Sequence, residues 1–154
     1  MKSIFETEIN IPREKLSELY ADPENIIKWM SDIEKYEPIS GTPGMPGSKY
    51  YLIPKKGNMV FTATVLNRDL PDEIRLNLEA SNVDVLVTGK FIALSPDMTK
   101  FISQEIFTFK GLFNKMFGFL AQSAIGKAHH KHMKDFIEFA KTVKLNHNKA
   151  GSAQ

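Results

Sequence analysis

Glu73-Ile74-Arg75-Leu76-Asn77-Leu78-Glu79-Ala80 alternates polar and apolar residues without interruption. Because successive side chains of a strand point to opposite faces, this run predicts an antiparallel strand with one face buried and the other in water. Stretches rich in β-branched and aromatic residues flank it, at residues 50–54, 59–67, 83–94 and 99–109. Turn signals such as Leu70-Pro71-Asp72 and Ser95-Pro96-Asp97 separate these stretches, so we expect a meander of hairpins.

The chain before the meander predicts another strand and two short helices. Residues 4–11 alternate as an opening strand, and Pro12 suits the first turn of a helix over residues 12–21. Asp22-Pro23-Glu24 combines a cap, a first-turn proline and a first-turn acid, which favours a second helix. A short strand at residues 33–38 should follow it.

The period changes to that of a helix from Leu112 to about Leu145. One face of this predicted helix collects residues at steps of three and four: Ile125, His129, His132, Met133, Phe136, Ala140 and Val143. We therefore expect an α+β fold in which a curved antiparallel sheet of about seven strands wraps around a long C-terminal helix. Imperfect closure of such a sheet on the helix leaves an apolar cavity.

Composition indicates one ordinary domain. The chain has 154 residues, of which 42% are hydrophobic and 25% charged, so we expect a single domain over residues 1–145 and a flexible tail over residues 146–154. It contains no cysteine, which excludes disulfides, thiolate nucleophiles and zinc sites built on sulfur. No apolar run reaches the roughly 20 residues of a membrane span. We expect a cytoplasmic protein.

Charge is divided unevenly along the chain. Residues 1–109 carry 12 Lys and Arg against 16 Asp and Glu, a balance of −4, whereas residues 110–154 carry a balance of +6. The total of +2 is too small to indicate nucleic-acid binding.

Three segments resemble a known family. Asp22-Pro23-Glu24-Asn25-Ile26-Ile27-Lys28-Trp29-Met30-Ser31-Asp32-Ile33, the Gly/Pro-rich loop from Gly41 to Ser48, and the helical end from Phe136 to Lys141 are similar to the START-like helix-grip superfamily (SRPBCC). That group includes polyketide cyclase/dehydrase and lipid-transport proteins. The resemblance spans about residues 2–145, although many members have a shorter glycine-containing turn at residues 95–99. It implies a cavity for a hydrophobic ligand, usually without a metal or other cofactor.

The leading functional hypothesis is the binding or transport of a small hydrophobic ligand such as a lipid, an isoprenoid or a polyketide-like molecule. The residues expected to line the cavity are Trp29, Phe61, Leu76, Leu78, Val87, Phe91, Phe107, His129, Met133 and Phe136. Three glycines, two prolines and Met45 make the loop at residues 41–47 a candidate gate, or simply a long connection.

Two other functions stay open. An enzyme of the cyclase/dehydratase type would use His129, His132 or Glu105 as general acid or base. The alternation around Glu105 does not decide whether this carboxyl or Gln104 faces the cavity. A co-chaperone-like interaction module would dock a partner on the basic C-terminal helix. The histidine pair alone falls short of a metal site, so we expect none.

Peripheral membrane contact is a further possibility. Its candidate segment contains Phe113, Met116, Phe117 and Leu120 beside Lys110 and Lys115. The sequence lacks a Gly-x-Ser-x-Gly elbow, a His-Glu-x-x-His motif and a dinucleotide-binding fingerprint, which makes hydrolases, classical metalloproteases and nucleotide enzymes poor candidates. It specifies neither the ligand nor the oligomeric state.

Overall fold

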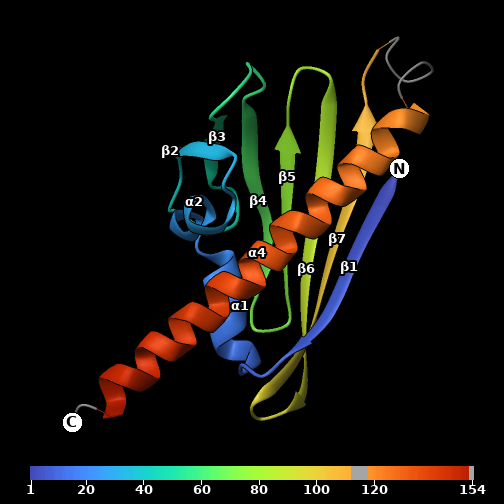
Figure 1. Ribbon diagram of the computed structural model, residues 1–154. Coiled ribbons are helices and arrows are strands. Elements are labelled where there is room, and N and C mark those ends of the chain that lie inside the picture. The colour runs from blue at the N-terminus through green and yellow to red at the C-terminus, as the bar shows by residue number, and fades with distance from the viewer. Residues whose placement is uncertain (112–117, 153–154) are drawn as a thin grey trace.

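A curled antiparallel sheet holds one long helix against its concave face in the computed structural model, which describes residues 1–111 and 118–152 (Figure 1). The elements in chain order are β1 (Lys2–Ile9), α1 (Arg13–Ala21), the 3-10 turn η1 (Pro23–Asn25), α2 (Ile26–Trp29), β2 (Ile33–Ser40), β3 (Lys49–Pro54), β4 (Phe61–Asp69), β5 (Glu73–Glu79), β6 (Val83–Ser95), β7 (Met98–Phe109) and α4 (Gly118–Ser152).

The sheet has seven strands in the order β1-β7-β6-β5-β4-β3-β2. Every neighbouring pair is antiparallel, and β2 to β7 follow one another as a meander that β1 extends at the β7 side. The predicted α+β helix-grip architecture is confirmed, including the two short helical segments between β1 and β2.

The long helix differs from its predicted limits. Residues 112–117, where its start is expected, lie outside the described residues, and α4 is described from Gly118. Its other end is Ser152, so residues 146–152 are helical where the sequence predicts a flexible tail. Residues 145–150 contain neither Gly nor Pro, and Lys144 donates a hydrogen bond to the Asn10 carbonyl, which holds this part of the helix beside the end of β1.

Aromatic rings fill the space between the concave face and the helices. Tyr20 of α1 lies at the centre of this group, with its ring centroid 5.1 Å from that of Phe136 on α4 and 5.3 Å from that of Phe101 on β7. It also stacks on Trp29 of α2 at 6.0 Å. One side chain therefore contacts three of the elements that enclose the core.

Tyr20 reaches this position because β6 carries a glycine beneath it. A Cβ atom at Gly89 would lie 2.8 Å from Cε1 of the Tyr20 ring, closer than carbon atoms approach. An isolated glycine within a strand often marks such a close approach. Gly89 therefore lets α1 pack directly on the middle of the sheet.

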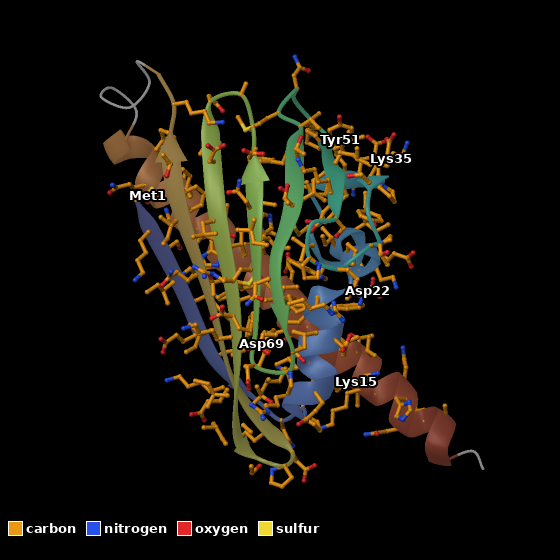
Figure 2. All side chains as sticks on the ribbon, turned by 180° about the vertical axis from the view of Figure 1, so that it is seen from behind. Met1, Lys15, Asp22, Lys35, Tyr51 and Asp69 are labelled. Carbon is orange, nitrogen blue, oxygen red and sulfur yellow. The ribbon has the colours of Figure 1, made fainter. Side chains whose placement is uncertain are left out.

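The two edge strands of the sheet, β1 and β2, differ in what interrupts their free backbone hydrogen-bonding groups. At the β1 margin, His130 of α4 donates a hydrogen bond from Nε2 to the Ile4 carbonyl over 2.9 Å. At the β2 margin, Pro38 lacks a backbone N–H, and the pairing of β2 with β3 shifts register on both sides of residues 35–38. The outer face, seen in Figure 2 in front of α4, carries mixed charges.

Replacing Phe136 tests whether the aromatic group holds the helix in place. This side chain is fully buried, so we expect Phe136→Ala to lower the free energy of unfolding by about 3–5 kcal/mol. Lys134→Ala, at an exposed position of the same helix, is the control and should change it by less than about 0.5 kcal/mol. Urea denaturation followed by circular dichroism measures both, and similar values for the two variants would contradict the assignment.

Candidate functional site

A small pocket lies between the concave face of the sheet and the helical segments α1, η1, α2 and α4. Its volume is about 50 Å³, which has room for a few water molecules and is much smaller than the roughly 300 Å³ at which ligand sites begin. The lining is mostly apolar, with a carboxyl, an imidazole and two phenols: Tyr20, Ala21, Pro23, Ile26, Trp29, Met30, Tyr50, Leu52, Leu76, Leu78, Val87, Glu105, His132 and Met133.

Glu105 is the one acidic side chain among the described residues of this lining. Strand register places it on the concave face, between Ser3 of β1 and Val87 of β6. Its neighbour Gln104 lines a shallow groove on the outer face instead. Burial raises the pKa of the Glu105 carboxyl from 4.5 to about 7, because the charged form loses its hydration. The carboxyl is therefore partly protonated at neutral pH.

His129 lies directly behind this carboxyl and does not line the pocket. Its Nδ1 is 2.7 Å from the Ser3 hydroxyl and its Nε2 is 2.9 Å from the Ser103 hydroxyl, so one ring nitrogen donates and the other accepts. Burial, with smaller contributions from His130 and His132, lowers the pKa of His129 to about 4. A neutral ring with both nitrogens engaged links α4 to β1 and β7.

His132 occupies the pocket wall one helical turn further along α4. Its Nε2 lies 2.9 Å from Oδ1 of Asp32, which follows α2 in the chain. This hydrogen bond ties α4 to the turn between α2 and β2, next to the pocket residue Met30. The histidine thus joins two walls of the pocket.

Apart from His129, which lies behind the pocket, the predicted lining residues fall into three groups. Those in the pocket wall are Trp29, Leu76, Leu78, Val87 and Met133, together with the predicted acid–base candidates Glu105 and His132. Phe91 and Phe136 lie in the aromatic core, each almost fully buried, and do not line the pocket. Phe61 and Phe107 lie beside it, packed on a second apolar cluster around Val83, Val85 and Val87.

The pocket is also lined by residues that were not predicted from the sequence, above all Tyr20, Met30, Tyr50 and Leu52. The alternation of Tyr50 and Leu52 along β3 was a usable signal, since both point to the same face. Tyr20 gave no such signal, because helical period alone does not show which side chain reaches furthest across the sheet.

The candidate gate at residues 41–47 is held at several points. The Gly47 N–H donates to the Val65 carbonyl over 2.8 Å, and the buried Ser48 hydroxyl donates to the Met45 carbonyl over 2.6 Å. Arg68 bonds both the Gly44 carbonyl and the Glu18 carboxylate of α1. These contacts fix the loop to β4 and α1. Its role as a gate stays a prediction.

Within residues 1–111 and 118–152, no group of three or more His, Asp or Glu side chains is arranged to hold a metal ion. No described helix is both long and apolar enough to cross a membrane. The predicted membrane-contact residues Phe113, Met116 and Phe117 lie outside the described residues.

Comparisons with known proteins agree on the fold. The sequence matches no protein-family model, and no curated protein matches it. Among solved structures, a START superfamily protein from Mycobacterium smegmatis superimposes with a TM-score of 0.77 at 15% identity, over 92% of this chain and 98% of that one. A protein from Thermus thermophilus gives a TM-score of 0.74 at 14% identity, over 93% and 99% of the two chains.

Norcoclaurine synthase from Thalictrum flavum, solved in complex with dopamine and hydroxybenzaldehyde, is also similar. Its TM-score is 0.68 at 18% identity, over 93% of this chain and 86% of that one. Identities this low show the fold alone. The chain therefore has the START-like helix-grip fold that its sequence resembles.

The raised pKa of Glu105 predicts a measurable pH dependence. Between pH 4.5 and about 7 the folded state binds this proton more strongly than the unfolded chain, so the contribution of this carboxyl to the free energy of unfolding falls as pH rises through this range. Glu105→Gln removes the effect. We expect the variant's free energy of unfolding, relative to wild type, to increase by about 2–3 kcal/mol from pH 4.5 to above pH 7.

Urea denaturation at a series of pH values measures this difference. The opposite contribution of His129 is present in both proteins and largely cancels. Glu8→Gln, at an exposed position of β1, is the matched control and should give a difference that stays flat with pH. A flat difference for Glu105→Gln as well would contradict the burial of the carboxyl.

Proposed function

We propose that this protein binds a small hydrophobic ligand in the pocket between the sheet and α4, and that the ligand is a lipid, an isoprenoid or a polyketide-like molecule. The observation that supports this most directly is the pocket itself: an apolar wall that includes one carboxyl, enclosed by elements that are otherwise tightly packed. Ligand sites commonly combine mostly apolar walls with a few polar groups. The cytoplasmic location expected from the sequence stays a prediction.

The pocket must enlarge to admit such a ligand. Met30 and Met133 lie in its wall, and methionine adapts its shape more readily than branched side chains. Leu76, Leu78 and Val87 belong both to the pocket and to the neighbouring apolar cluster, where Phe61 and Phe107 are only partly buried. Movement of the methionines would enlarge the pocket, and the neighbouring cluster provides further apolar surface beside it.

Filling the pocket should abolish binding. Leu78 lies in the wall and is only partly buried, so Leu78→Trp can place an indole in the cavity without a large loss of stability. We expect its affinity for the uncharged fluorescent probe N-phenylnaphthylamine to fall about tenfold or more. The control Leu66→Trp adds the same ring at an exposed position of β4 and should bind as wild type does.

Native mass spectrometry of the purified protein provides an independent test. A bound adduct of a few hundred daltons that disappears on denaturation would support the proposal. A bare chain, together with equal probe binding by Leu78→Trp and Leu66→Trp, would refute it.

A second candidate function is acid–base catalysis of the cyclase/dehydratase type, and Glu105 is the observation that favours it. A buried carboxyl with a pKa near 7 can give and take a proton at neutral pH. His129 does not share the pocket and His132 is bonded to Asp32, so this chemistry would depend on Glu105 alone. If the Glu105→Gln variant still turned over a substrate of the wild-type protein, acid–base catalysis by Glu105 would be excluded.

A protein-interaction role is the remaining candidate, and the small volume of the pocket favours it. Lys127, Lys131 and Lys134 are exposed on the side of α4 that faces away from the sheet. Reversal of these three charges would abolish recovery of a partner if the helix docks one, and unchanged recovery would count against this role.

A further inference from the structure

Two polar groups of the pocket residues, one fully buried and one partly buried, lack hydrogen-bond partners among the described residues. The indole Nε1 of Trp29 is buried and has no partner among the described residues. The Glu105 carboxyl makes no hydrogen bond to them either. Nε2 of His129 lies 3.9 Å from its Oε1 and is already bonded to Ser103. Buried polar groups are nearly always paired in native proteins, because an unpaired one loses its hydration without gaining a hydrogen bond.

Both residues line the same small pocket, and because the Nε1 atom is covered by neighbouring atoms, a ligand reaches it only when the pocket enlarges. Trp29 comes from α2 and Glu105 from β7, on different walls of a pocket of about 50 Å³. The indole N–H is a donor only, and a protonated carboxyl also donates. The two walls together therefore offer two donors to one acceptor.

The charge of the lining restricts that acceptor. The described lining residues include no Lys or Arg, and His132 is occupied by Asp32. Tyr20 and Tyr50 stay neutral, because burial raises the pKa of both phenols. A carboxylate or phosphate would be buried beside Glu105 without a Lys or Arg to pair with it, which is unfavourable. The acceptor should therefore be uncharged.

We infer that the ligand carries an uncharged carbonyl oxygen, which accepts hydrogen bonds from the Trp29 indole N–H and from the protonated Glu105 carboxyl. This rests on the proposed ligand-binding function and specifies the chemical class of the ligand: an apolar ketone, aldehyde or ester rather than a hydrocarbon or a fatty-acid anion. The pKa of about 7 for Glu105 means that the second donor is lost as pH rises above neutrality. A hydroxyl ligand would behave differently, because it can donate to the ionised carboxylate.

Three probes of similar size test the inference: ethylbenzene, acetophenone and phenylacetate. Trp29 is the only tryptophan, so its indole N–H gives a single, assignable signal in the spectrum of nitrogen-15-labelled protein. We expect acetophenone to move this signal downfield, as a new hydrogen bond does, and ethylbenzene to shift it much less. Phenylacetate should bind weakest, and acetophenone affinity should fall as pH rises above 7.

For each protein we take the ratio of its affinity for acetophenone to its affinity for ethylbenzene. Comparing this ratio between wild type and variants cancels the difference in hydrophobicity between the two probes. We expect this ratio to fall about fivefold to tenfold in Trp29→Phe and in Glu105→Leu, which each delete one donor. Glu105→Gln keeps an N–H donor, so it should retain the ratio and lose its dependence on pH. Binding of ethylbenzene by each variant shows that its pocket is intact.

The possible failures are distinguishable. An unchanged affinity ratio in Trp29→Phe and Glu105→Leu, or phenylacetate as the tightest ligand, would overturn the inference and leave the proposed function standing. Absence of binding by all three probes and by N-phenylnaphthylamine would overturn the proposed function and the inference with it.

Discussion

The contact between the Tyr20 ring and the backbone at Gly89 is the constraint on which the arrangement of helices depends. With no side chain at Gly89, α1 lies directly on β6, and the Tyr20 ring then meets Trp29 of α2 and Phe136 of α4. Aromatic contacts of this kind add about 0.5–1.5 kcal/mol each to the burial of their surface. They fix the distance of α2 and α4 from the sheet on one side of Tyr20, and the pocket is the space that remains beside them.

The polar groups of the concave face form a short row within this apolar interior. Ser3, Ser103 and His129 satisfy one another, whereas Glu105, which follows Ser103 by two residues on the same face, does not gain a hydrogen bond. Burial shifts the pKa values of His129 and Glu105 in opposite directions, and each shift favours the neutral form. The row is therefore mostly uncharged between the pKa of His129, about 4, and that of Glu105, about 7, which avoids the desolvation of a buried ion pair.

Much of the fold could be predicted from the sequence, because strand period is a local property. The run at residues 73–80 and the turn at Ser95-Pro96-Asp97 place β5, β6 and β7 within a residue or two of their observed limits. The site was less predictable. Phe91 and Phe136 have the correct period for the cavity face but lie deeper in the core, since period defines a face and not a depth. The face of the sheet on which Glu105 lies could be determined only from the register of β7 against its neighbours.

The proline and register shifts of β2 have a consequence for the behaviour of the molecule in solution. A sheet margin with a regular series of free N–H and C=O groups can template the addition of strands from another chain. Pro38 removes one of these donors, and the irregular pairing around it disturbs the spacing of the others. At the β1 margin, the side chain of His130 occupies the Ile4 carbonyl. Both edge strands thereby offer a less regular series of free backbone groups, which disfavours the addition of a strand from another chain.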